Sequence, residues 1–131
     1  MSPRLLVIDA SAVVEVLRGT ERGAQVAETM RGASLAAPAH LDAEVLSAVG
    51  RLAGAATLTD AMVERALAQL LRLPVQRYPL PPLLRRAWSL RDNIALRDGL
   101  YVACAEAIGA ELLTVDGRLA SSAPVQVQHL K

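Results

Sequence analysis

The sequence predicts a single α/β domain with a parallel central sheet. Short apolar segments with branched residues, typical of buried strands, alternate with amphipathic segments of helical periodicity. Strands that alternate with helices in this way form parallel sheets through right-handed crossovers. The 131 residues match the usual length of one domain, and the chain contains no repeat, linker or low-complexity tract. We therefore expect residues 1–131 to form one domain.

The first three elements are expected to be a strand and two helices. Residues 4–9 form an apolar run that ends in Asp9, which is typical of a buried strand. Residues 11–18 have an amphipathic helical pattern, and Gly19 follows at the position of a helix C-cap. Residues 21–30 indicate a second helix with a weaker pattern.

The middle of the chain repeats this alternation. Residues 34–36 indicate a short strand, and Pro38 introduces a long helix over residues 39–53. A further amphipathic helix covers about residues 60–73. Residues 75–78, which lie between prolines, indicate another short strand.

The C-terminal third is expected to hold two helices and two strands. Residues 83–90 form a helix that carries the only tryptophan, Trp88. Residues 98–108 are almost all apolar, so this helix is expected to be buried on several sides. Residues 111–116 repeat the opening pattern of an apolar strand that ends in aspartate, and residues 125–128 predict the last strand.

The charged residues exclude several classes of function. The net charge is +1, which excludes a polybasic protein that coats nucleic acid without specificity. Thirteen of the 14 basic residues are arginines, and the only lysine is the last residue, Lys131. Without an internal lysine, Walker-type nucleotide hydrolases and Schiff-base enzymes are excluded. The arginines suit phosphate or carboxylate contacts, although a genome rich in arginine codons would leave the same composition.

The cysteine count and the apolar runs bear on location. The single cysteine, Cys104, allows no internal disulfide, and the N-terminal apolar run is too short for a secretory signal. No run approaches the roughly 20 apolar residues that span a bilayer. These features predict a cytoplasmic protein that does not enter a membrane.

Four carboxylates are expected to meet at one edge of the sheet. Asp9 and Asp116 end strands, Asp98 opens the buried helix, and Glu44 lies in the first turns of the helix after Pro38. In an open parallel sheet, the carboxyl ends of strands and the N-termini of the following helices share one edge, where ligands bind. Each aspartate has an alternative interpretation as an ordinary helix cap, and a lone helical glutamate is usually a surface residue.

Clustered carboxylates repel one another unless a cation lies among them. Mg²⁺ prefers oxygen ligands and shares them with substrate phosphates, and Mn²⁺ accepts the same set. A zinc site is not expected, because Cys104, His40 and His129 are isolated in the sequence. The pattern therefore points to phosphodiester chemistry with one or two metal ions.

The remaining candidates are interpreted as structural residues. Trp88, Tyr101 and Cys104 are expected in the core, and His40 is expected to take no part in the site. Most of the other acids are expected at the surface or at helix caps; the set is Glu15, Glu21, Glu28, Asp42, Asp60, Glu64, Asp92, Glu106 and Glu111.

Four segments in order carry a recognisable pattern: Asp9-Ala10-Ser11-Ala12 after a strand, Glu44 with Arg51 seven residues later, Asp98-Gly99-Leu100-Tyr101-Val102-Ala103, and Thr114-Val115-Asp116-Gly117-Arg118-Leu119. Together they resemble the motifs of PIN-domain ribonucleases, and more narrowly the VapC toxins of type II toxin–antitoxin systems. The likeness covers essentially the whole chain. It implies a three-layer α/β/α sandwich with a mostly parallel central sheet, and an endoribonuclease that uses Mg²⁺ or Mn²⁺.

The resemblance also implies roles for single residues and partners. Asp9, Glu44, Asp98 and Asp116 would be both the catalytic acids and the metal ligands, while the hydroxyls of Ser11 and Thr114 would support the site. A homodimer is implied, inhibited by a VapB-like antitoxin that lays a C-terminal segment across the acidic groove. Gly99 stands where alanine is common, and we expect it to loosen the start of its helix.

The mechanism expected is in-line attack of a metal-activated water on an RNA phosphodiester, with Asp9, Asp98 and Asp116 on the principal metal. Glu44 would complete the ligand shell of the metal and could accept a proton from the water. Four arginines are candidates for contacts with RNA phosphates, each with the alternative of a surface ion pair; they are Arg51, Arg91, Arg97 and Arg118.

Two alternatives remain open at this point. A catalytically silent PIN-like module would bind RNA or a protein without cleaving it. A phosphatase would form a phosphoenzyme at Asp9, but Ser11 stands where such an enzyme has a second aspartate. The charge also favours nucleic acid as the binding partner, because the net charge of the chain without the four proposed metal ligands is +5.

Overall fold

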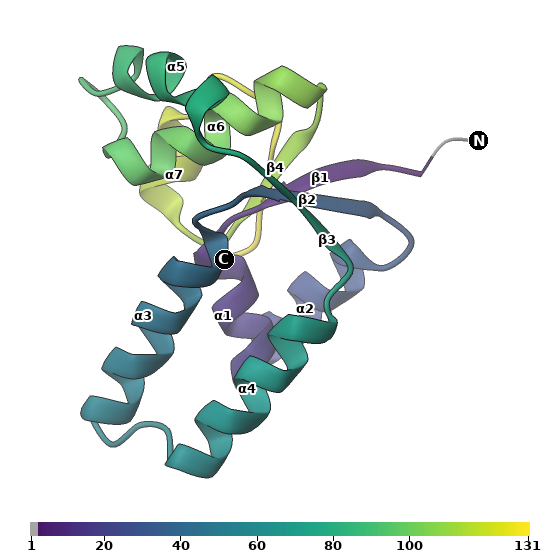
Figure 1. Ribbon diagram of the computed structural model, residues 1–131. Helices are drawn as coiled ribbons and strands as arrows, with labels where there is room; N and C mark the ends of the chain where they lie inside the picture. The colour runs from purple at the N-terminus through teal and green to yellow at the C-terminus, as the bar shows by residue number, and fades with distance from the viewer. Residues whose placement is uncertain (1–2) are drawn as a thin grey trace.

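The protein has a five-stranded sheet in which every neighbouring pair of strands is parallel. The computed structural model describes residues 3–131 (Figure 1). The strand order is β3-β2-β1-β4-β5, so the chain starts in the centre, builds toward one edge and then crosses back to build toward the other. The strands are β1 (Leu5–Ile8), β2 (Ser34–Pro38), β3 (Val75–Tyr78), β4 (Glu111–Thr114) and β5 (Val127–His129).

Helices cover both faces of the sheet, which confirms the predicted three-layer α/β/α sandwich. One layer contains α1 (Ala10–Arg18), α2 (Glu21–Met30), α3 (Leu41–Gly54) and α4 (Asp60–Arg72). The other contains α5 (Leu84–Ser89), α6 (Leu96–Ile108) and α7 (Gly117–Ser122), with a short 3₁₀ turn, η1 (Pro81–Leu83), before α5. Within residues 3–131, no helix is both long enough and apolar enough to cross a membrane.

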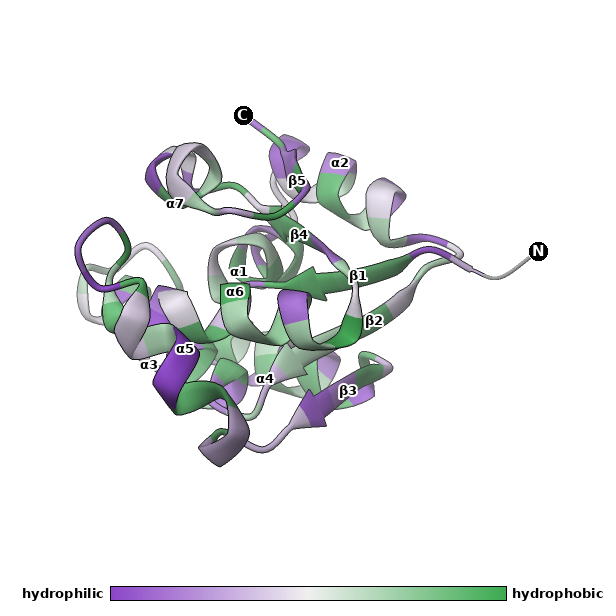
Figure 2. Ribbon diagram, turned by 90° about the horizontal axis from the view of Figure 1, so that it is seen from above, coloured by the Kyte–Doolittle hydropathy of each residue, from purple (hydrophilic) through white to green (hydrophobic). Residues whose placement is uncertain are grey.

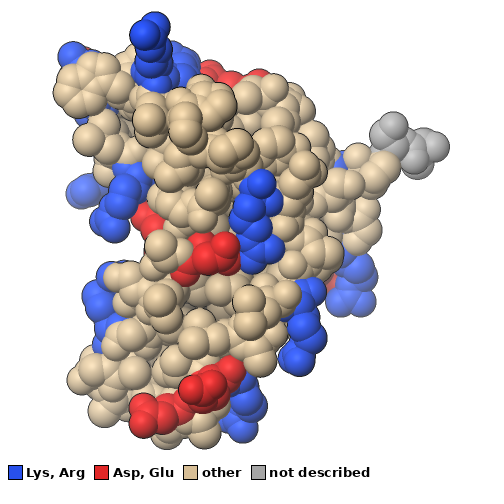
Figure 3. Space-filling view, viewed as in Figure 1, with Lys and Arg blue, Asp and Glu red and all other residues tan. Residues whose placement is uncertain are grey.

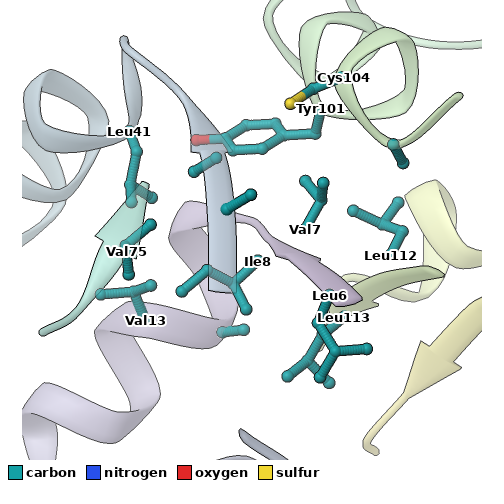
Figure 4. Close-up of a cluster of buried hydrophobic side chains, with 14 of the residues drawn as sticks. Leu6, Val7, Ile8, Val13, Leu41, Val75, Tyr101, Cys104, Leu112 and Leu113 are labelled. Carbon is teal, nitrogen blue, oxygen red and sulfur yellow. The ribbon is translucent and has the colours of Figure 1, made fainter. Parts of the chain in front are cut away.

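The core lies on both faces of β1. Leu6, Val7 and Ile8 are all completely buried, as expected for a central strand between two helical layers. Figure 4 shows their side chains among those of the neighbouring strands and helices, and Figure 2 shows the apolar residues gathered around the central strands. Helix α6 is buried from Gly99 to Ala105, which confirms that this segment is enclosed on several sides.

Two of the predicted elements have the boundaries that the structure shows, although one of them has only a weak helical pattern. The helix over residues 21–30 and the strand over residues 75–78 have the predicted bounds. Strand β2 runs on to Pro38, because its last residues pair with β3 as far as Tyr78, so α3 begins at Leu41 rather than at residue 39. Proline therefore ends a strand here instead of starting a helix.

Three predictions near the C-terminus were wrong in position. Helix α6 begins at Leu96, so Asp98 is the third residue of the helix and does not cap it. Strand β4 ends at Thr114, and α7 then forms where no helix was expected, capped by Asp116. The last strand is shifted to Val127–His129 by its parallel pairing with β4.

Two glycines allow helices to approach one another closely. A Cβ on Gly23 would lie 2.0 Å from the backbone oxygen of Glu15, so α2 crosses α1 at a point where only glycine fits. A Cβ on Gly99 would lie 3.2 Å from the backbone oxygen of Ala87. Gly99 is buried against α5, so it also allows α5 and α6 to pack closely, a role that the sequence did not indicate.

The substitution Gly23→Ala tests the close approach of α1 and α2. Alanine normally stabilises a helix by about 0.5–1 kcal/mol relative to glycine. At Gly23 the clash with the backbone of Glu15 should reverse this sign and cost at least about 2 kcal/mol of unfolding free energy. Denaturant unfolding of the variant measures the difference.

Gly50→Ala is the matched control. Gly50 lies inside α3, and a Cβ there meets no atom within 4 Å. This variant should be slightly more stable than wild type. Equal effects of the two substitutions would contradict the packing described here.

Candidate functional site

The candidate site lies where the strand order reverses. After β1 the chain continues toward β2, whereas after β4 it continues toward β5, so the connections leave these two neighbouring strands in opposite directions. Such a point opens a crevice at the carboxyl edge of a parallel sheet. Asp9 follows β1 directly, and Asp116 lies two residues beyond β4. The two aspartates therefore stand on either side of the crevice.

A pocket of about 320 Å³ occupies this crevice, and all four predicted acids line it. Asp9 and Asp116 come from the strand ends, Glu44 from α3 and Asp98 from the first turn of α6. Figure 3 shows the surface hollowed between the part formed by α1–α4 and the part formed by α5–α7, with acidic atoms inside and basic residues at the margin. The fold thus gathers carboxylates that are up to 107 positions apart in the sequence.

Asp9 is the most buried of the four acids, with 3% of its surface exposed. Its Oδ1 accepts hydrogen bonds from the Ser11 hydroxyl at 2.7 Å and from the Ala12 backbone N–H at 3.0 Å. Its Oδ2 accepts one from the Thr114 hydroxyl at 2.5 Å. Burial raises the pKa of Asp9 to about 6; these hydrogen bonds oppose the rise, and the charge of Asp98 adds to it.

The hydroxyls of Ser11 and Thr114 connect Asp9 to the backbone that follows β4. They lie 3.2 Å apart, and each accepts a hydrogen bond from that backbone: Ser11 from the N–H of Val115 at 3.3 Å, Thr114 from the N–H of Asp116 at 2.9 Å. The ends of β1 and β4 are therefore fixed relative to each other. This is the kind of contact that orients ligating carboxylates.

Asp9 and Asp116 also cap helices, as the alternative interpretation of these residues predicts. Asp9 caps α1, while Oδ1 of Asp116 accepts hydrogen bonds from the backbone N–H groups of Arg118 at 2.9 Å and Leu119 at 3.1 Å. In the described residues, no group donates to Oδ2 of Asp116. A carboxylate can therefore cap a helix and still direct one oxygen to the pocket.

Glu44 is oriented by two aromatic side chains. The Tyr101 hydroxyl donates to Oε1 at 2.6 Å, and Nε2 of His40 lies 3.5 Å from the same oxygen. Figure 4 shows the Tyr101 oxygen directed away from α6, toward the side of Leu41. Tyr101 is buried, as predicted, and burial together with the Glu44 carboxylate raises its pKa above the ordinary value.

His40 is part of this arrangement, so the prediction that it stays outside was wrong. Its ring packs against that of Tyr101 at an angle of 39° with centroids 4.7 Å apart, and Nε2 lies 3.0 Å from the carbonyl oxygen of Arg97. It thereby joins the start of α3 to the start of α6. No spacing in the sequence indicated this contact, because it depends on packing between helices 57 residues apart.

Asp98 receives no hydrogen bond from the described residues, and its surroundings oppose its charge. Partial burial raises its pKa, and the carboxylates of Asp116 and Glu44 raise it further, against smaller effects of Arg97 and His40. As the side chains stand in residues 3–131, no three His, Cys, Asp or Glu groups converge closely enough to hold a metal ion. The donors nevertheless fit a hard divalent cation, which would neutralise the repulsion and draw them together.

The four candidate arginines divide between two adjoining hollows. Arg51 and Arg97 line the pocket that contains the four carboxylates, called the acid pocket from here on. Arg91 and Arg118 line a neighbouring hollow of about 370 Å³ that shares Asp98 and Asp116 with the first. The structure thus brings all four close to the acids, but only two into the same pocket.

Trp88 lies outside the core, contrary to the prediction. Its side chain is 58% exposed, and the guanidinium of Arg91 lies over its ring, 4.3 Å from the centroid. Helix α5 is only six residues long and contributes Ala87 rather than Trp88 to the core. Cys104 is completely buried, as expected, and burial raises the pKa of its thiol to about 11.

Two residues that line the acid pocket were not predicted from the sequence. Glu15, one of the acids mostly expected at the surface or at helix caps, is buried and lines the pocket together with Arg22. A carboxylate in the otherwise apolar stripe of residues 13–17 was the only available signal. Arg22 had none, because its position depends on how α2 packs on α1.

Comparisons with known proteins agree with this geometry. The family model described as PIN domain matches residues 6–123. Ribonuclease VapC3 of Mycobacterium tuberculosis is 48% identical over 93% of this chain and 90% of the relative, and Ribonuclease VapC12 of the same organism is 43% identical over 90% and 92%. A chain of a toxin–antitoxin complex from Klebsiella pneumoniae has the same fold, with a TM-score of 0.70, 16% identity, and coverage of 96% of this chain and 98% of that one.

The raised pKa of Asp9 predicts how the stability of the metal-free protein depends on pH. Since the pKa rises from 3.8 to about 6 on folding, ionisation of Asp9 costs about 3 kcal/mol of folding free energy. Below about pH 4 Asp9 is protonated in the folded and the unfolded chain, so the protein does not bear this cost. The free energy of unfolding falls by this amount as the pH rises through about 6. Denaturant unfolding in a chelator should show this loss in wild type and a smaller loss in Asp9→Asn. Parallel stability curves for the two proteins would contradict it.

Proposed function

Since the chain belongs to the PIN-domain family and is related to VapC-type ribonucleases, we propose that it is a metal-dependent endoribonuclease that acts as the toxin of a toxin–antitoxin pair. It would cleave cellular RNA, such as tRNA or rRNA, and so arrest translation and growth. The observation that carries the proposal is the gathering of Asp9, Glu44, Asp98 and Asp116 in one pocket at the carboxyl edge of the sheet. The identity to curated ribonucleases over nearly the whole chain supports the same conclusion.

Asp9, Glu44, Asp98 and Asp116 would hold Mg²⁺, with Mn²⁺ as a substitute. When bound, the cation supplies a contact for a phosphate oxygen and lowers the pKa of a coordinated water. Asp9 enters this role with both oxygens already oriented by Ser11, Ala12 and Thr114. Its ligand geometry is therefore set before any substrate arrives.

Glu44 would complete the set of metal ligands and could accept a proton from the attacking water. Its Oε1 already accepts the Tyr101 hydroxyl, which leaves Oε2 for a second partner, with Arg97 3.7 Å away. Arg51 and Arg97, on the wall of the same pocket, would contact phosphates on the RNA strand. These positions orient a phosphodiester toward the carboxylates.

We further propose that a VapB-like antitoxin holds the protein inactive by covering the acid pocket, and that the toxin is a homodimer. The resemblance to VapC toxins supports both partners. The fold shared with a chain of the Klebsiella pneumoniae toxin–antitoxin complex supports the first.

A catalytically silent module that only binds RNA or a protein is the alternative from another class. The presence of all four carboxylates in one pocket favours the enzyme, because a binding module gains nothing from buried acids that repel each other and RNA. A phosphatase with a phosphoenzyme at Asp9 is disfavoured, because Ser11 stands where such an enzyme has a second aspartate.

Cleavage of RNA by the purified protein tests the proposal. Wild type should cut cellular RNA with Mg²⁺ or Mn²⁺ and lose this activity in a chelator. Asp98→Asn should lower the rate by at least about 100-fold, because substitution of groups that merely support ligands already costs 10–100-fold. The rate of appearance of new RNA ends, mapped by sequencing, is the measurement.

Glu64→Gln is the matched control, because Glu64 is an exposed carboxylate on α4, outside the acid pocket. It should cleave like wild type, and both variants should unfold cooperatively. If wild type cut no RNA with either metal and Asp98→Asn behaved identically, the silent module would replace the nuclease.

A further inference from the structure

Arg22 and Glu15 form an ion pair on the wall of the acid pocket, at the end formed by α1 and α2. Nη2 of Arg22 lies 2.9 Å from Oε1 of Glu15. The other oxygen of Glu15 accepts the Thr20 hydroxyl at 2.5 Å. The Glu15 side chain is only 10% exposed, whereas that of Arg22 is 39% exposed. A buried carboxylate thus anchors a guanidinium that still reaches the pocket.

The junction between α1 and α2, which carries this ion pair, is closely packed. Thr20 caps α2, its hydroxyl accepting a hydrogen bond from the backbone N–H of Gly23 at 2.9 Å. Gly23 lies against the backbone of Glu15, so α1 and α2 have little freedom to move apart. Burial opposes ionisation of Glu15, but the hydrogen bonds from Thr20 and Arg22 and the charges of Arg22 and Arg18 outweigh it and lower its pKa.

The other arginines of this pocket are less constrained. The Arg97 side chain is 77% exposed and lies 3.7 Å from Glu44, and Arg51 is exposed and donates to the Ser47 hydroxyl. A guanidinium has five N–H donors in a planar fork, and within the described residues Arg22 uses only one of its nitrogens. A fork oriented in advance loses less entropy when it binds a planar or tetrahedral oxyanion.

We propose that Arg22, oriented by Glu15, forms a phosphate-binding subsite for the RNA strand at the α1–α2 end of the acid pocket. The subsite would hold a phosphodiester next to the one at the four carboxylates. Glu15 is a positioning residue, since it acts through Arg22. The inference rests on the proposed ribonuclease function and extends it to a further contact with the substrate. The competing interpretation is that the ion pair only ties α2 to α1.

Binding of labelled single-stranded RNA to the full chain in a chelator tests the subsite without reference to cleavage. Arg22→Ala should raise Kd about 5–10-fold and reduce the slope of log K against log salt by about 0.7, the value for one phosphate on a single strand. Arg22→Lys should retain the salt slope but raise Kd, because it keeps the charge and loses the fork. Arg72→Ala, an exposed arginine on α4, is the matched control and should change neither quantity.

Kinetic and stability measurements distinguish a phosphate-binding subsite from an ion pair that only ties α2 to α1. With Mg²⁺, Arg22→Ala should raise KM about 5–10-fold with kcat within about twofold of wild type. Glu15→Gln should raise Kd by a smaller factor and keep the salt slope, because Arg22 remains but is less well oriented.

If Arg22→Ala matched Arg72→Ala in Kd and salt slope while its unfolding midpoint fell, the pair would be a structural tie and the proposal would be wrong. Wild type that bound no RNA would also overturn it. Wild type that bound RNA with the predicted Arg22 effect but cleaved none would contradict the ribonuclease function and leave the subsite standing.

Discussion

The site depends on one electrostatic constraint, which is the burial of Asp9 among other carboxylates. A carboxylate with 3% exposure is costly to ionise, and Asp98 beside it increases the cost. Ionisation of Asp98 is in turn opposed by the charges of Asp116 and Glu44. Such groups call for compensation by something else, and a divalent cation would compensate all four at once.

The sheet topology makes this constraint possible. The order β3-β2-β1-β4-β5 puts the ends of β1 and β4 side by side, so Asp9 and Asp116 face a common crevice. The hydroxyls of Ser11 and Thr114 then fix the two strand ends relative to each other. From the opposite walls, α3 supplies Glu44, oriented by Tyr101, and α6 supplies Asp98. Each acid is thus positioned by a different element, and the pocket exists only when the whole domain is folded.

The sequence was sufficient for the features that rest on local pattern and sheet topology. Apolar runs that end in aspartate predict strands β1 and β4 and bring Asp9 and Asp116 to one edge. It was not sufficient where a side chain depends on contacts between distant helices. The exposure of Trp88, the contact of His40 with Glu44 and the pairing of buried Glu15 with Arg22 all arise from packing that no spacing encodes. Helix α7 was not predicted, although the alternative interpretation of Asp116 as a helix cap was correct: its Oδ1 accepts hydrogen bonds from the N–H groups of Arg118 and Leu119.

The most direct test of the metal centre is a crystal structure of the protein soaked with Mn²⁺, with anomalous scattering data collected to locate the ion. The account predicts an anomalous difference peak in the pocket between Asp9, Glu44, Asp98 and Asp116, with carboxylate oxygens drawn toward it, and no such peak in Asp98→Asn under the same conditions. The absence of a peak in wild type at saturating Mn²⁺, or a peak distant from all four carboxylates, would contradict it.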